Sequence, residues 1–251
     1  MAAGTVMLTG FELADVMGHA LLESQGLVAK AGSSPISGVP VAILLGLALK
    51  NQPLLALPAS LAPGLAFCTK KVLQAGIICV GAKLSVYDVA STGSACVPAV
   101  VTAIGSGLVF TTWAASRMGL SMRMGSLIAA GTSICGVTAI TAIAPAIAAT
   151  QAETAVAVAT VVAFGTSSML TYPVLAHNYL PFEFSEQVGL FLGIAIHDTA
   201  QVMGAGMTYN EMYDDEVALQ WASITKLTRN LFLAAAIPVL VYRNAIAEVA
   251  A

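Results

Sequence analysis

The stretch Gly193-Ile-Ala-Ile-His-Asp-Thr-Ala-Gln-Val-Met-Gly-Ala-Gly206 places three polar side chains inside an apolar run. That run, Val188–Met207, is long and apolar enough to cross a bilayer, which takes about 20 residues. His197, Asp198 and Gln201 stand in its middle. An ionisable group at that depth costs roughly 2.5–3.5 kcal/mol on insertion scales, so it needs a partner, water or substrate beside it. The stretch therefore predicts a buried polar site within a membrane-embedded helix bundle.

The composition indicates an integral membrane protein. Of the 251 residues, 58% are hydrophobic and only 9% are charged, whereas soluble domains carry about 25% charged residues. A soluble chain with so few charges could not cover its surface. We therefore expect an all-α, polytopic transmembrane helix bundle in the lipid bilayer of a plasma or inner membrane, or of an organelle. The net charge of −3 and the lack of a basic arm exclude a nucleic-acid partner.

Residues 1–33 are predicted to form an amphipathic segment of their own. Glu12, Asp15, His19 and Glu23 recur every three or four residues, which places them on one face of a helix. A helix with this polar stripe cannot span a membrane alone, so we expect it at the interface or as a peripheral helix. Residues 34–251 then form the transmembrane bundle.

The bundle is predicted to contain seven apolar segments. They lie at Gly38–Leu49, Val72–Val86, Cys96–Ser116, Met124–Ala149, Thr154–His177, Val188–Met207 and Ala222–Tyr242. If each crosses once, six basic residues fall on one side, namely Lys50, Lys70, Lys71, Arg117, Arg123 and Arg243. The other side receives two lysines and the acidic loop of residues 211–216. The positive-inside rule then makes the basic side cytoplasmic.

A second polar block, Gly131-Thr-Ser-Ile-Cys-Gly136, interrupts the fourth segment. Its two glycines weaken a helix in mid-membrane, where breaks are tolerated only if they are buried or line a cavity. The block therefore favours a broken helix at a transporter-like site. The alternative is that its small residues only allow close helix packing. An alignment of this segment with the sixth puts Ser133 opposite His197.

Lys226 and Arg229 form a third candidate because they share a helix face near the start of the last segment. Two interpretations are open. Both side chains could snorkel to the interface, which the preceding Trp221 would mark. Alternatively, they supply positive charge to a buried site, because surplus basic residues are not expected on the side that the charge count places outside.

Three motifs together resemble the YeiH-like sulfate exporter family, which comprises uncharacterised multi-helix membrane proteins of bacteria. The motifs are Gly131-Thr-Ser-Ile-Cys-Gly136, Ile196-His-Asp-Thr-Ala-Gln-Val202 and Lys226-Leu-Thr-Arg229. That family usually has Glu where this chain has Asp198, and it continues through about three further helices. The resemblance therefore implies a C-terminally truncated sequence, a trimmed fold, or a dimer that supplies the missing wall.

The resemblance implies a transporter that exports a small inorganic or organic anion, such as sulfate, through a midplane site. The implied substrate-binding residues are Thr132, Ser133, Cys135, Gly136, His197, Asp198, Gln201, Lys226 and Arg229. The basic pair would supply charge, with Arg as a bidentate fork, and the hydroxyls and exposed amides would donate hydrogen bonds. The His–Asp pair would carry a coupling proton or cation. We expect no cofactor and no metal, and a homo-oligomer is a further expected partner.

Two other function classes are weighed against transport. An intramembrane enzyme would use the His–Asp pair or Cys135 as catalytic or metal-binding groups. One such pair offers too few ligands, and the sequence has no H-x-x-x-H or H-E-x-x-H spacing, so we expect no enzyme. A non-transporting membrane subunit, or an incomplete fragment of a transporter, remains the main alternative.

Overall fold

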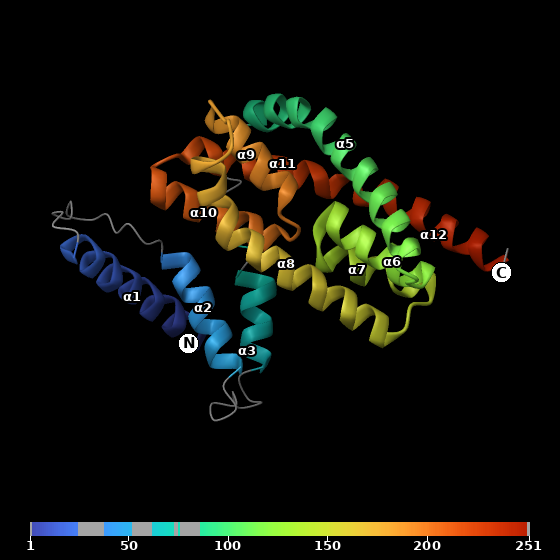
Figure 1. Ribbon diagram of the computed structural model, residues 1–251, viewed down its shortest axis with the longest axis horizontal. Coiled ribbons are helices and arrows are strands. Elements are labelled where there is room, and N and C mark those ends of the chain that lie inside the picture. Colours follow the sequence, from blue (N-terminus) through green and yellow to red (C-terminus); the bar gives the residue numbers. More distant parts are fainter. Residues whose placement is uncertain (1, 25–37, 52–61, 73–74, 76–85, 250–251) are drawn as a thin grey trace. The chain divides into compact units, whose positions relative to one another are not determined.

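The computed structural model describes residues 2–24, 38–51, 62–72, 75 and 86–249 (Figure 1). Throughout these residues the regular structure is helical, without strands, which confirms the all-α fold. The chain forms two compact units. The first comprises Met1–Ser85 and Met207–Asp215, and the second comprises Val86–Gly206 and Glu216–Ala251.

In the first unit, α1 (Ala2–Ser24) packs against α2 (Gly38–Asn51). The contact is close because the facing residues are small: a methyl group built on Gly10 would stand 2.6 Å from Ala42 Cα. The predicted polar stripe is helical, and its Glu12, Asp15 and His19 are exposed. The boundary at residue 33 stays a prediction.

The first unit also contains α3 (Ala62–Phe67) and the π-helical turn η3 (Cys68–Val72). The predicted segment Gly38–Leu49 corresponds to α2. The predicted segment Val72–Val86 lies mostly outside the described residues.

Two helices of the second unit are long and apolar enough to cross a membrane: α5 (Val86–Arg117) and α8 (Gln151–Asn178). Helices α11 (Glu216–Leu231) and α12 (Leu233–Val249), bent by 42° at the break between them, are together long and apolar enough to be a third candidate span. These three match predicted segments three, five and seven.

The fourth predicted segment does not cross, contrary to expectation. Helix α6 (Met122–Ala130) continues into a π-helical turn, η4 (Gly131–Cys135). The chain then reverses, and α7 (Val137–Ile143) leads back to the short 3-10 turn η5 (Pro145–Ile147). We call α6 through η5 hairpin 1.

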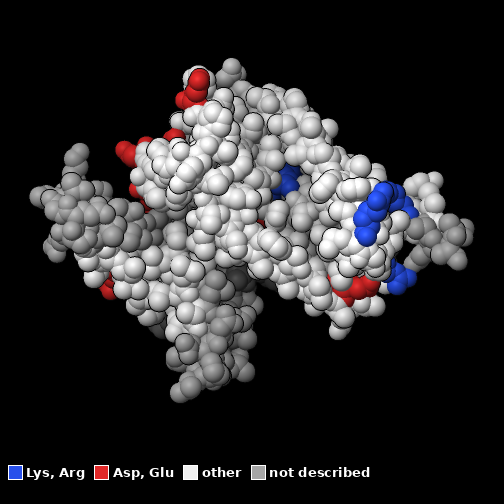
Figure 2. Space-filling view, in the orientation of Figure 1, with Lys and Arg blue, Asp and Glu red and all other residues white. Residues whose placement is uncertain are grey.

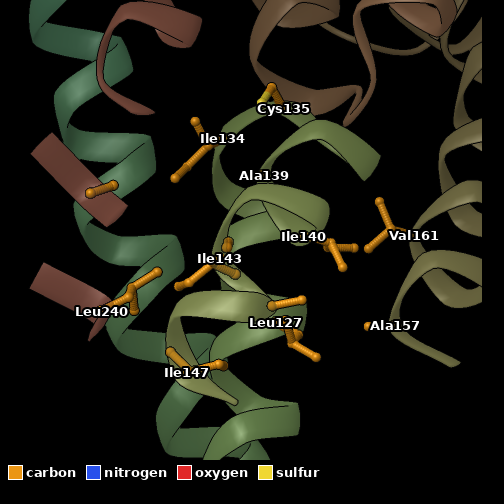
Figure 3. Close-up of a cluster of buried hydrophobic side chains, with 13 residues drawn as sticks. Leu127, Ile134, Cys135, Ala139, Ile140, Ile143, Ile147, Ala157, Val161 and Leu240 are labelled. Atoms are coloured by element: carbon orange, nitrogen blue, oxygen red, sulfur yellow. The ribbon is translucent and has the colours of Figure 1, made fainter. Parts of the chain in front are cut away.

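Contacts between its two arms establish the reversal. A methyl group built on Gly131 would stand 2.7 Å from Ile140 Cδ1, although nine residues separate them in sequence. At the base, Ser121, just after α5, donates a hydrogen bond to Glu153 in the first turn of α8 across 2.8 Å. The start of α8 therefore lies beside the end of α5. Figure 3 shows the apolar interior of hairpin 1, with Cys135 at the tip and Ile147 nearer the base.

The reversal depends on one glycine. Gly136 has φ 64° and ψ −130°, a conformation that residues with a Cβ rarely adopt. A continuous helix through this block, as the hydropathy alone suggests, would require a right-handed helical conformation there.

The sixth predicted segment also folds back rather than crossing. Helix α9 (Ser185–Ala195) ends where Ile196 becomes extended, and α10 (Thr199–Tyr213) begins after Asp198. We call α9, the break and the part of α10 up to Gly206 hairpin 2. Its course is fixed by α11, along which both arms lie.

The arms of hairpin 2 run in opposite directions along α11. On α9, methyl groups built on Gly189 and Gly193 would reach the backbone of Ala218 and Ala222, so α9 runs parallel to α11. On α10, Thr199 accepts a hydrogen bond from Asn230, and a methyl group on Gly206 would touch Leu219. Helix α10 is therefore antiparallel to α11, and the break forms the tip.

The two hairpins enter the second unit from opposite ends. The base of hairpin 1 lies where α5 ends and α8 begins, whereas hairpin 2 starts from the other end of α8. Helix α8 contacts both, through Val161 beside Gly131 and through Thr166 beside Gln201. Its 28 residues span about 42 Å, enough to separate the two bases by a membrane thickness.

Because both the fourth and the sixth predicted segments turn back, the later basic and acidic residues of the second unit stay at the ends where they were predicted. Arg117, Arg123 and Arg243 belong to the end at which hairpin 1 enters, and blue side chains gather over that end in Figure 2. Arg243, for example, donates to Thr112 near the end of α5. Glu216 begins α11 at the opposite end.

Candidate functional site

The tips of both hairpins meet α11 at Lys226 and Arg229. These side chains are almost fully enclosed, with 1% and 3% of their surfaces exposed. They lie one helical turn apart on the buried face of α11. The snorkelling interpretation is therefore wrong, because a snorkelling side chain would reach the solvent-facing interface.

Lys226 joins the two tips through its ammonium group. Its Nζ donates to Ile134 O of hairpin 1 across 3.2 Å and to Ile196 O of hairpin 2 across 3.1 Å. A third, short hydrogen bond goes to His197 O. An ammonium group has three donors, so all of them are used.

Arg229 joins the same tips through its guanidinium group. Nε donates to Ser133 O across 2.8 Å, and Nη2 donates to Thr132 O across 2.6 Å, both in hairpin 1. Nη1 donates to Ile194 O at 2.5 Å and to Ile196 O at 3.3 Å in hairpin 2. Four of five donors are used, which leaves one N–H on Nη2.

These carbonyls are the free C-terminal ends of the first arm of each hairpin. Each helix end carries a partial charge near −0.5 and up to four carbonyls without a helical partner. In the described part of the chain, the groups that bind the two cations are these carbonyl oxygens rather than carboxylates. Lys226 and Arg229 thus cap two helices that end inside the bundle.

Both cations bind carbonyls of both hairpins. Arg229 binds Thr132 and Ser133 of hairpin 1 with Ile194 and Ile196 of hairpin 2. Lys226 binds Ile134 of hairpin 1 with Ile196 and His197 of hairpin 2, so each cation joins corresponding helix ends of the two hairpins. The predicted alignment of Ser133 with His197 stays a prediction.

Asp198 and Gln201 start the second arm of hairpin 2 as a reciprocal cap. Asp198 Oδ1 accepts from Ala200 N across 2.9 Å, and Gln201 Oε1 accepts from Asp198 N across 3.3 Å. These bonds are related to a capping box and satisfy two free amides at the helix N-terminus, with Asp198 bonded to the second helical residue instead of the third. Both residues were predicted to bind substrate, a role that stays a prediction.

Gln201 also fastens hairpin 2 to α8. Its Nε2 donates to Val162 O across 3.3 Å and to Thr166 Oγ1 across 3.2 Å. A methyl group on Gly165 would stand 2.1 Å from Gln201 Oε1, so a larger residue there would displace the Gln201 amide. With both amide hydrogens and the oxygen engaged, Gln201 acts as a positioning residue. Sequence reasoning missed Gly165 and Thr166, whose only signal is a small or polar residue within a span.

The carboxylate of Asp198 also lies against the tip of hairpin 1. A methyl group on Gly136 would stand 3.0 Å from Asp198 Oδ2. Gly136 is the N-cap of α7 and provides no side-chain cap of its own. The carboxylate is therefore placed beside the N-terminal ends of both second arms.

Of three other predicted residues, two have a buried side-chain atom without a hydrogen-bond partner and one is hydrogen-bonded. Ser133 Oγ and His197 Nδ1 are buried without a hydrogen-bond partner, and a methyl group on Gly107 of α5 would stand 2.5 Å from Ser133 Oγ. Thr132 Oγ1 donates to Ile128 O across 2.8 Å, a bond internal to its helix.

Cys135 is buried at the tip of hairpin 1 (Figure 3). The structure thus brings all nine predicted residues to the two tips and the adjoining turn of α11. Among the described residues, His, Cys, Asp and Glu form no group of three that could hold a metal ion.

Comparisons with known proteins place this architecture in a family. The family model described as conserved hypothetical protein 698 matches residues 19–249. A UPF0324 membrane protein of Bordetella pertussis is 33% identical over 238 residues, covering 93% of this chain and 65% of its own length. A UPF0324 membrane protein of Bacteroides thetaiotaomicron is 31% identical over 208 residues, covering 83% of this chain and 60% of its own length.

The chain spans less than two thirds of the length of these relatives. No solved structure matches. The relatives are named only as membrane proteins, in agreement with the apolar spans described above. The chain is an integral membrane protein that belongs to the conserved hypothetical protein 698 family, the UPF0324 membrane proteins.

Proposed function

We propose that the protein is a membrane transporter that carries a small anion through the place where the two hairpin tips meet, and exports it as the resemblance to sulfate exporters implies. The observation that carries this proposal is a buried cationic pair, Lys226 and Arg229, held between helix ends that enter from opposite sides. Helices broken near the midplane are where many transporters bind substrates and coupling ions.

The arrangement also suits alternating access. Each tip is covalently continuous with a base at one end of the bundle, whereas the cations bind carbonyls of both tips. Moving one tip away from α11 would expose the cations to one end only, while the other tip stays closed. The helices that separate the bases, α5 and α8, would serve as the frame for this motion.

A flux measurement tests the proposal. The full chain is reconstituted into liposomes loaded with unlabelled anion, and counterflow of labelled sulfate and of smaller labelled anions is followed. We expect uptake above that of protein-free liposomes, and its loss in Arg229→Gln, which removes the charge of a buried fork. The matched control is Arg117→Gln, because Arg117 lies against Trp113 at the basic end, away from the tips.

The alternative of a non-transporting subunit predicts a different outcome. Well-folded wild-type protein would then give no flux of any anion, and the Arg229 and Arg117 variants would be indistinguishable in this assay. Formation of a chemically altered product without flux would instead indicate an enzyme.

A further inference from the structure

We propose that the anion carried at the hairpin tips is singly charged, and that Asp198 sets this valence. The inference rests on the proposed transport function and adds the charge class of the substrate. It follows from the charges at the tips, counted one helix end at a time.

Lys226 and Arg229, together with the ends of the first arms, leave about one unit of positive charge. Lys226 and Arg229 contribute two positive charges, both buried and bound to backbone carbonyls. The C-terminal ends of the two first arms contribute about −0.5 each. The cations are thus about half neutralised by the helix ends that they cap.

The N-terminal ends of the second arms offset the negative charge of Asp198. Helix α10 and the apolar arm Val137–Ile147 both begin at the tips, and each N-terminal end contributes about +0.5. The carboxylate of Asp198 accepts from Ala200 N of α10 and also lies against Gly136, the N-cap of the other arm. One negative charge therefore offsets two half charges, and His197 counts as neutral in this sum.

The whole site is left with about one net positive charge, which matches a monoanion. A dianion would bring a second negative charge into a buried region that has nothing left to neutralise it, which is costly in a low-dielectric interior. Removing the charge of Asp198 would raise the site to about two positive charges and favour a dianion.

Few side-chain donors at the tips are free. Lys226 has no free N–H, and Arg229 has one. Ser133 Oγ and His197 Nδ1 are the buried side-chain atoms at the tips that lack partners. The remaining hydrogen bonds to an anion would come from backbone amides at the starts of the second arms, so charge rather than the number of side-chain donors selects the anion.

The test compares two anions of similar tetrahedral shape that differ by one charge: labelled methanesulfonate and labelled sulfate. The full chain is reconstituted in liposomes, and initial uptake rates are measured at equal ionic strength. We expect methanesulfonate to be taken up at least about tenfold faster by the wild type. In Asp198→Asn the sulfate-to-methanesulfonate ratio should rise about tenfold, the size expected for unit charges roughly 10 Å apart at an effective dielectric constant near 20.

Controls separate charge from folding. Asn and Ser cap helices about as well as Asp, so Asp198→Asn and Asp198→Ser should both fold and both shift the ratio. Asp198→Glu should keep the wild-type preference, and Glu186→Gln, which removes a charge from the first turn of α9, should not shift it.

The outcomes are distinguishable. Sulfate uptake as fast as methanesulfonate uptake in the wild type, or an unchanged ratio in both neutral Asp198 variants, would overturn the monoanion assignment and leave anion transport standing. Absence of wild-type flux for both anions, with protein that is folded and inserted, would overturn the proposed function itself and this assignment with it.

Discussion

The two hairpins reverse the chain by different chemistry. Hairpin 1 turns on Gly136, which has a positive φ and no side-chain cap. Hairpin 2 turns through extended Ile196 and starts its second arm with the Asp198–Gln201 cap, fastened to α8. The first tip depends on backbone freedom and the second on side-chain hydrogen bonds. The comparison teaches that matching helix ends, rather than matching residues, define this site.

The largest expected effect comes from the residue that both hairpins share. Arg229→Met would leave three buried carbonyls without their side-chain partner, each at about 1–3 kcal/mol, because Ile196 O keeps its hydrogen bond from Lys226. We expect a loss of more than about 4 kcal/mol, read as a large drop in thermal stability in detergent. Arg117→Met, at the basic end, should change stability by less than about 0.5 kcal/mol.

Equal stability of the two arginine variants would show that the carbonyl contacts do not hold the tips. Arg229→Lys sharpens the comparison between hairpins. It keeps the charge but cannot reach four carbonyls, so part of the loss should remain.

A smaller effect is expected from the turn of hairpin 1. Gly136→Ala would place a Cβ in a positive-φ conformation and 3.0 Å from Asp198 Oδ2, which together should destabilise the protein by about 3 kcal/mol. Gly119→Ala is the matched control, because its φ is 73° but a Cβ there meets open space. Its cost should be about 1 kcal/mol. Equal costs for both variants would show that Gly136 and Asp198 are not in close contact.

The smallest effect is expected where hairpin 2 is fastened to α8. Gly165→Ala should displace Gln201 and destabilise the protein by about 1–2 kcal/mol. In a Gln201→Ala background the same change should be nearly neutral, since the clash is gone. Gly105→Ala, with nothing near its Cβ, is the control on α5. Additive effects of the Gly165 and Gln201 changes in a thermal-stability cycle would contradict this fastening.

Much of the fold could be predicted from the sequence because apolar length is a direct signal. The span of α8 follows from hydropathy and was predicted within a few residues. Helix α5 begins at Val86 rather than Cys96, and the bent pair α11–α12 extends beyond the predicted Ala222–Tyr242 at both ends. Hydropathy cannot distinguish a run of about 20 apolar residues that crosses from one that turns back. Only Gly136 and the cap at Asp198 mark the reversals, and both patterns also occur in continuous or packed helices.

The site was located from sequence more successfully than its chemistry. Polar residues in apolar runs are expensive, so His197, Lys226 and Arg229 drew attention. Their partners are backbone carbonyls, which every residue carries and no pattern reveals. The expected bidentate fork for an anion is therefore already occupied by Thr132 and Ser133 in this structure. Gly107 and Gly165 were missed because close packing leaves no distinct mark on a glycine.

Cysteine labelling tests most directly whether the two hairpins enter from opposite ends and meet at the cationic pair. In a chain with its native cysteines replaced, Leu120→Cys and Gln151→Cys flank hairpin 1, and Gln187→Cys and Val217→Cys flank hairpin 2, all at exposed positions. Impermeant reagent should label the first pair from one side of the membrane and the second pair from the other. Labelling of positions 120 and 151 from opposite sides would contradict the account.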